Sequence, residues 1–82
     1  MNQPRRTKLK KIFWKLVALQ TEIRKIEEEE QDAFDNLPES LAASERGDQM
    51  QEFIELLDAA QGSIVTTQEE IHEVMTTDTA IA

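Results

Sequence analysis

Asn36 and Pro38 interrupt an otherwise continuous helical pattern near the middle of this 82-residue chain. Asparagine is common where helices end, and proline cannot continue a helix because it lacks the backbone N–H for the next hydrogen bond. Apolar residues on both sides of the interruption recur every three or four positions, as in packed helices. The sequence therefore predicts one domain with a helix over residues 4–34, a bend over 35–43, a second helix over 44–76 and a frayed tail over 77–82.

The apolar positions of the two predicted helices form two stripes. The first stripe is Leu9, Ile12, Leu16, Leu19, Ile23 and Ile26, continued by Glu30, Ala33 and Leu37. The second stripe is Met50, Ile54, Leu57, Gln61, Ile64, Gln68, Ile71 and Met75. Both alternate steps of three and four, the spacing of coiled coils. Folding the chain back about Ser40 pairs Leu19 with Gln61 and Ile12 with Gln68, which predicts an all-α antiparallel two-helix hairpin.

Local signals refine this prediction at the helix ends. Asn2 or Thr7 is suited to cap the first helix, and Ser44 to cap the second. Gly47 is a poor helix former, and its position beside the bend predicts a close approach of two backbone segments there.

A lone hairpin leaves apolar side chains uncovered on both helices. Those that flank the stripes are Phe13, Val17, Phe34, Phe53, Ala60 and Val74. Exposed apolar surface usually marks an interface, and a short chain without cysteine has no disulfide to compensate for a small core. We therefore expect a homodimer that forms a four-helix bundle. The residues expected to mediate self-association are Phe13, Val17, Phe53, Ile64 and Ile71.

Charge is divided unevenly along the chain, whose net charge is −8. Residues 1–25 hold eight Lys or Arg and one acid, whereas residues 26–82 hold Arg46 and sixteen acids. The basic segment either pairs internally, Lys10 with Glu70 and Lys11 with Glu69, or binds nucleic acid or an anionic membrane. The acidic segment either maintains solubility or meets a basic surface on a partner protein. The residues expected to bind such a partner are Trp14, Glu27, Glu28, Glu29, Glu30, Asp32 and Asp35.

Motifs for catalysis or metal binding are scarce. The chain has no Cys and a single histidine, His72, without a Ser or Asp at a spacing that suggests a triad. Glu69 and His72 have the Glu-x-x-His spacing of di-iron bundles, but the predicted facing segment is basic. No glycine-rich phosphate-binding loop occurs. The sequence predicts no enzyme, no metal and no cofactor.

The bend reads Asp-Ala-Phe-Asp-Asn-Leu-Pro-Glu-Ser-Leu, followed by Ser44-Glu45-Arg46-Gly47 and Met50. This sequence resembles small helical-hairpin (coiled-coil) proteins encoded by bacteriophages and prophages. The resemblance is most specific over residues 32–50. The resemblance implies a phage origin and no enzymatic activity, and it implies no particular target. No apolar run approaches the roughly 18–20 residues of a membrane span, and no signal peptide is visible, so a cytoplasmic protein is expected.

Three functions are compatible with these features. The leading hypothesis is a non-catalytic protein–protein interaction module, such as an inhibitor that presents a DNA-mimicking acidic surface to a host defence or nucleic-acid enzyme. The first alternative is direct binding of nucleic acid or a membrane surface through residues 5–15. The second alternative is a structural or assembly protein of the virion.

Overall fold

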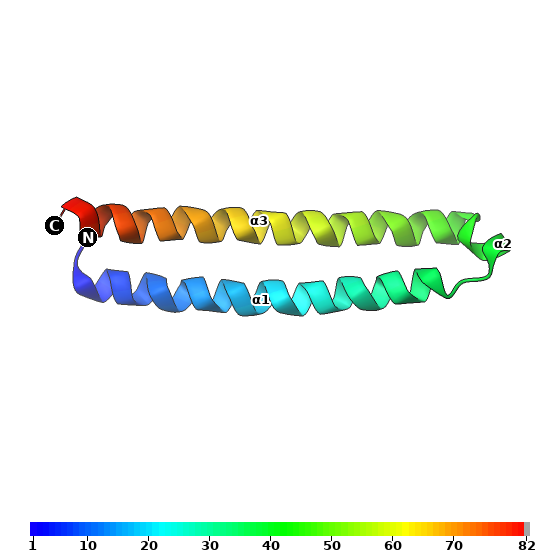
Figure 1. The fold of residues 1–82 in the computed structure, drawn as a ribbon, viewed down its shortest axis with the longest axis horizontal. Coiled ribbons are helices and arrows are strands. Elements are labelled where there is room, and N and C mark those ends of the chain that lie inside the picture. The colour runs from blue at the N-terminus through cyan, green and yellow to red at the C-terminus, as the bar shows by residue number, and fades with distance from the viewer. Residues whose placement is uncertain (82) are drawn as a thin grey trace.

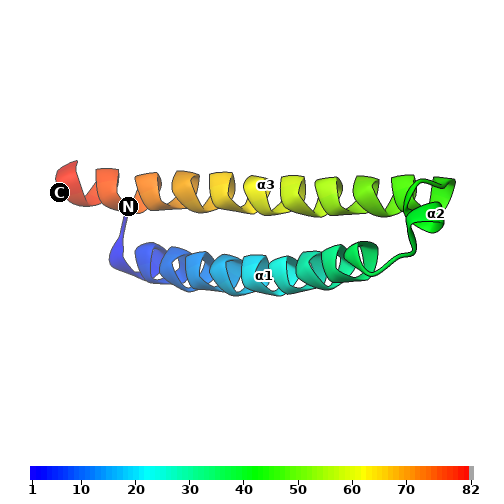
Figure 2. The same cartoon turned by 45° about the vertical axis from the view of Figure 1, so that its right-hand side comes forward.

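The computed structural model describes the backbone of residues 1–81 and the side chains of residues 1–77. Within it, α1 spans Gln3–Asp35, α2 spans Glu39–Ala42 and α3 spans Glu45–Ile81. The two long helices run side by side in opposite directions (Figure 1, Figure 2). The molecule extends 61 × 15 × 13 Å, and the described backbone contains no strand. The predicted all-α architecture is confirmed, and its two long helices form an antiparallel hairpin.

Asparagine side chains close both ends of α1. Asn2 Oδ1 accepts a hydrogen bond from the backbone N–H of Arg5 at 3.0 Å, so Asn2 rather than Thr7 is the N-terminal cap. At the other end, Asn36 Nδ2 donates to the carbonyl oxygen of Asp32 at 2.9 Å. The first bond satisfies a backbone N–H that has no partner within the helix, and the second adds to the hydrogen bond that the Asp32 carbonyl accepts from the backbone N–H of Asn36.

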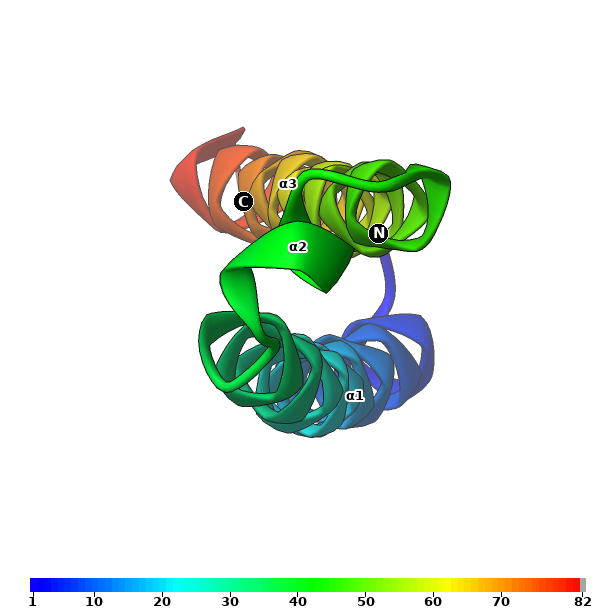
Figure 3. The same ribbon diagram turned by 90° about the vertical axis from the view of Figure 1, so that its right-hand side faces the viewer.

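The bend depends on a backbone contact at Gly47. Gly47 is buried, and a Cβ atom at this position would lie only 2.0 Å from the carbonyl oxygen of Ala42. Only glycine therefore allows the first turn of α3 to pack against α2, which lies between the ends of the long helices (Figure 3). The predicted close approach at Gly47 is confirmed. Ser44 precedes α3, and its carbonyl oxygen accepts the N–H of Asp48 at 3.1 Å.

The second long helix continues to Ile81, past residue 76 where the sequence predicts its end. Ala82, the last residue of the predicted frayed tail, lies outside the described residues. Three threonine hydroxyls of α3 are satisfied within the helix, since Thr66, Thr67 and Thr76 each donate to the carbonyl four residues earlier. These β-branched residues are thereby accommodated without a break.

The seam between α1 and α3 contains one predicted stripe and a modified version of the other. On α3, every predicted stripe position is buried or half-buried. On α1, the seam positions are Leu9, Phe13, Leu16, Gln20, Ile23, Glu27, Glu30 and Phe34, and half-buried Leu37 continues them beyond the end of the helix. The prediction was wrong for Ile12, Leu19, Ile26 and Ala33, which are exposed. Each is replaced in the seam by the residue that follows it in the sequence.

Two side-chain hydrogen bonds across the seam define its register. Gln61 Nε2 donates to Glu27 Oε2, and Gln68 Nε2 donates to Gln20 Oε1 at 3.1 Å. The sequence predicted Leu19 and Ile12 opposite these glutamines, so the predicted register was wrong by about two helical turns along α1. The midpoint of the fold lies near Ser44 rather than Ser40, because α2 lengthens the bend on the α3 side.

This register also separates the charges that the sequence predicted to meet. With Gln61 opposite Glu27, Lys11 lies at the level of Thr77 rather than Glu69. The expected pairs of Lys10 with Glu70 and Lys11 with Glu69 are therefore not aligned. The register is therefore set by polar side chains inside the seam and by the bend.

We predict opposite effects for the two glycine-to-alanine substitutions. Gly47→Ala should lower the free energy of unfolding by about 1–3 kcal/mol, because the new methyl group would overlap the Ala42 carbonyl. Gly62→Ala is the matched control in the same helix, where a Cβ would meet nothing within 4 Å. It should raise stability by about 0.5–1 kcal/mol. Urea unfolding followed by circular dichroism, at one fixed protein concentration, measures both; equal effects would contradict the bend geometry.

We also predict energetic coupling between Glu27 and Gln61. In a double-mutant cycle of Glu27→Ala and Gln61→Ala, the coupling energy should reach about 1 kcal/mol, because each single change removes the hydrogen bond that joins the two side chains across the seam. The control cycle pairs Gln61→Ala with Glu28→Ala, an exposed neighbour. It should be additive within about 0.5 kcal/mol. Coupling to Glu28 but not to Glu27 would contradict the register.

Candidate interaction surface

The hairpin has too little thickness to enclose an apolar core. Among the side chains that the structure describes, no apolar one is fully buried, and the most enclosed polar one is Gln61 at 9% exposure. The chain exposes 6163 Å², whereas a compact protein of 9.4 kDa exposes about 5,000 Å². Its radius of gyration is 18.4 Å, compared with about 12 Å for a compact domain of this length. Much apolar surface therefore stays in contact with solvent.

On α1, all of the large exposed aliphatic side chains fall on one line. Ile12, Leu19 and Ile26 are 44, 49 and 54% exposed. They are seven residues apart, and Ala33 continues the series. Because seven residues complete close to two helical turns, side chains at this spacing lie one above another along the helix.

A second line runs along α3 with the same spacing. It consists of Phe53, Ala60, Thr67 and Val74, all exposed. Leu56, three residues after Phe53 and 59% exposed, widens this line near the bend. Like the line on α1, it lies beside the seam rather than on the outermost side of the helix, since each member directly precedes a seam position.

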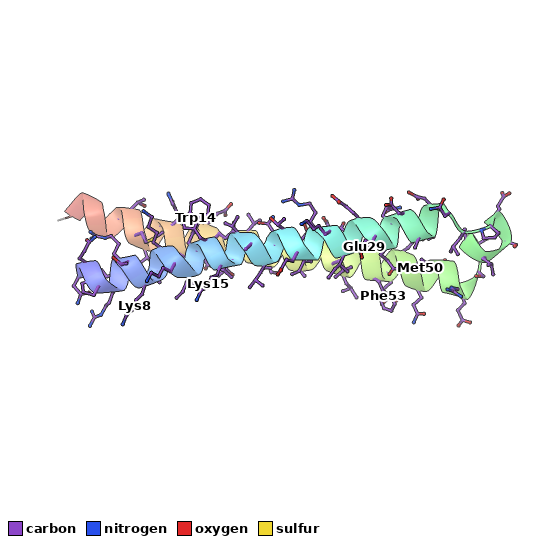
Figure 4. The ribbon with its side chains drawn as sticks, turned by 90° about the horizontal axis from the view of Figure 1, so that it is seen from below. Lys8, Trp14, Lys15, Glu29, Met50 and Phe53 are labelled. Carbon is purple, nitrogen blue, oxygen red and sulfur yellow. The ribbon has the colours of Figure 1, made fainter. Side chains whose placement is uncertain are left out.

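Both lines lie on the same long edge of the hairpin. Lys8 and Lys15 precede and follow Ile12 by four and three residues, so they flank it on the helix surface. Lys8, Lys15 and Phe53 project from one edge, and Trp14 from the other (Figure 4). In the observed register the two lines interleave along the full length of the hairpin. We call this surface the apolar face; its members are Ile12, Leu19, Ile26, Ala33, Phe53, Leu56, Ala60 and Val74.

The opposite edge carries an aromatic cluster near the N-terminus. Trp14 is 60% exposed and packs edge-on against Phe13, with ring centroids 5.4 Å apart. The Phe13 ring also lies 6.2 Å from the ring of His72 on α3. Together with Lys10 and Met75, these rings line a shallow hollow on the surface. The Trp14 ring therefore packs against Phe13 on one side and is exposed to solvent on the other.

The structure divides the residues predicted for self-association. Phe13, Val17, Ile64 and Ile71 are half-buried, the last two in the seam positions of α3. Only Phe53 belongs to the apolar face. Sequence reasoning assigned the other members on α1 to the seam. The signal that identifies them is their repeat of exactly one heptad, running parallel to the repeat on α3.

The acids predicted for partner binding do not form one surface. Glu27 and Glu30 are half-buried and occupy seam positions. Glu28, Glu29 and Asp32 are exposed, as is Asp35, which accepts a hydrogen bond from Gln31 Nε2 at 2.9 Å. Trp14 lies near the other end of α1. The structure thus places the tryptophan and the acids at separate ends of the hairpin.

The described part of the chain contains neither a metal-binding cluster nor a membrane-spanning helix. Among side chains 1–77, no group of three or more His, Cys, Asp or Glu has an arrangement that could hold a metal ion. None of the described helices is long and apolar enough to cross a membrane. No family model, curated protein or solved structure matches this chain. The apolar face and the division of charge therefore carry the functional proposal.

Proposed function

We propose that this chain is a non-catalytic protein-interaction module that works as a homodimer, with the apolar face at the dimer interface. The observation that carries the proposal is an inversion of polarity in the lone hairpin. Gln20, Glu27, Gln61 and Gln68 occupy the seam, whereas isoleucine and leucine side chains remain about half exposed beside it. Burial normally favours the reverse. A second hairpin on the apolar face would cover these side chains and complete a four-helix bundle.

The amount of exposed surface also supports a dimer. The hairpin exposes about 1,200 Å² more than a compact protein of its mass. A standard interface removes roughly 800 Å² from each partner, so an interface of ordinary size accounts for most of the excess. On α1, the column of Ile12, Leu19, Ile26 and Ala33 puts an apolar residue beside the seam in every heptad, including those where Gln20 and Glu27 occupy the seam itself. An apolar position added beside the two seam positions is typical of helices in bundles rather than in two-stranded coiled coils.

A dimer of this kind leaves the bend free to bind another protein. Between Glu27 and Asp58 the chain has twelve acids and only one basic residue, Arg46. Most of these acids are exposed, and an acidic surface attracts basic partners such as the nucleic-acid-binding groove of an enzyme. The resemblance of residues 32–50 to phage hairpin proteins suits such a role in an infected bacterium. We therefore propose that a basic host or phage protein binds this acidic end.

The dimer is tested by polar substitution on the apolar face. The unmodified chain should have twice its 9.4 kDa mass by light scattering. Leu19→Gln combined with Ile26→Gln should shift the mass toward that of the monomer. The variant would lose the free energy gained by burying these two half-exposed apolar side chains in the interface.

The matched control for this test is Ala18→Gln combined with Lys25→Gln. Both positions are exposed on the same helix, each one residue before a substituted position, and they face away from the seam. The control should retain the mass of the unmodified chain. An unmodified chain that stays monomeric, or a face variant that stays dimeric, would overturn the proposal.

A further inference from the structure

We propose that the two hairpins of the dimer pack with their bends at opposite ends, so that α1 covers α1 of the second copy and α3 covers α3. This inference rests on the proposed dimer and adds the arrangement of its two copies. It follows from the position of charged residues along the border of the apolar face.

Two twofold arrangements bury the apolar faces of both copies. If the axis runs along the helices, both bends lie at the same end, and α1 covers α3 of the second copy. If the axis crosses the helices at a right angle, the bends lie at opposite ends, and α1 covers α1. All neighbouring helices are antiparallel in both arrangements. Helix dipoles therefore do not distinguish them.

The residues that border the apolar face along α1 are basic in the first half of the helix and acidic in the second half. They are Lys8, Lys15, Glu22 and Glu29, seven apart and all exposed. With the bends at opposite ends, Lys8 of one copy lies beside Glu29 of the other, and Lys15 lies beside Glu22. The twofold axis repeats both pairs. In the same-end arrangement the border residues Lys8, Lys15, Glu22 and Glu29 lie nearest to Thr77, Glu70, Ser63 and Leu56 of α3 in the second copy, so only Lys15 finds an opposite charge.

The distribution of charge over the whole hairpin favours the same arrangement. Residues 1–25 are strongly basic, and the acids gather from Glu27 to Asp58 around the bend. Bends at the same end would bring two acidic regions within the Debye length of about 8 Å at physiological salt. Bends at opposite ends place each acidic region beside the basic segment of the other copy. One contact opposes the arrangement with bends at opposite ends, because Glu70 would lie near Glu70 of the second copy, close to the twofold axis.

The apolar residues and the charged residues of α1 independently place the twofold axis at the same point along the helix. Leu19 is the middle residue of α1, which spans Gln3–Asp35, so full overlap of two α1 helices brings Leu19 beside Leu19 of the second copy. Ile12 then lies beside Ile26 of the second copy, one heptad on either side. The charge pattern reverses between Lys15 and Glu22, whose midpoint falls at the same place. Both patterns therefore map onto themselves by a single twofold rotation.

Single-cysteine cross-linking tests this arrangement, because the chain has no native cysteine. In the full chain, Leu19→Cys should give a covalent dimer with a short bismaleimide, which tolerates a wider separation than a disulfide does. Ala18→Cys, on the outer side of the same helix, is the matched control and should remain uncross-linked. Efficient cross-linking of Leu19→Cys alone supports the inference.

The other outcomes separate this inference from the proposed dimer. If Leu19→Cys has a dimeric mass, fails to cross-link with itself and cross-links when mixed with Thr67→Cys, the bends lie at the same end and only the inference is overturned. If Leu19→Cys and Ala18→Cys cross-link equally, the contact is non-specific and the inference is also overturned. A monomeric mass for the unmodified chain overturns both proposals.

Charge reversal gives a second measurement. Lys8→Glu with Lys15→Glu makes the border uniformly acidic, and Glu22→Lys with Glu29→Lys makes it uniformly basic. Each variant alone should raise the dimer Kd by about tenfold or more at low salt, and an equal mixture should restore association as a heterodimer. Lys11→Glu with Lys25→Glu is the control, with the same charge change away from the border. An equal loss in the control, or no recovery in the mixture, would overturn the inference.

Discussion

The two polar contacts inside the seam, Glu27 with Gln61 and Gln20 with Gln68, determine how α1 and α3 are aligned. Apolar stripes of heptad spacing can pack in several registers of similar energy, because one leucine or isoleucine replaces another after each heptad. An enclosed amide or carboxylate is different, since it loses free energy wherever it finds no hydrogen-bond partner. Gln61 is the most enclosed polar side chain described; it donates to the carbonyl oxygen of Leu57 in its own helix, and it reaches the Glu27 carboxylate only in this register. The short bend, fixed at Gly47, must then span the remaining distance.

This alignment has a consequence on the outside of the hairpin. Phe13, Gln20 and Glu27 fill the seam positions and leave Ile12, Leu19 and Ile26 beside the seam, where one hairpin cannot cover them. In the proposed dimer, the same side chains would contribute to folding and to association together, so stability would depend on protein concentration.

The charge distribution has a separate role from the apolar surface. Exposed ion pairs add little to stability, but they discriminate between alternative arrangements of the same helices. Lys8 and Lys15 at one end of the border, with Glu22 and Glu29 at the other, favour one of two otherwise similar dimers. The proposed arrangement would distribute acidic ends to both tips of the bundle, where they remain open to a basic partner.

Local features of this fold were readable from the sequence, because they depend on neighbouring residues. The interruption at Asn36 and Pro38, the apolar stripe of α3 and the close approach at Gly47 are of this kind. The stripe of α1 was not, since Ile12 and Phe13 both follow Leu9 at a spacing that a packed helix allows. Hydrophobicity favoured the isoleucine column, whereas the structure places Phe13, Gln20, Glu27 and Phe34 in the seam. That choice belongs to the tertiary structure, because it rests on hydrogen bonds between side chains far apart in the sequence.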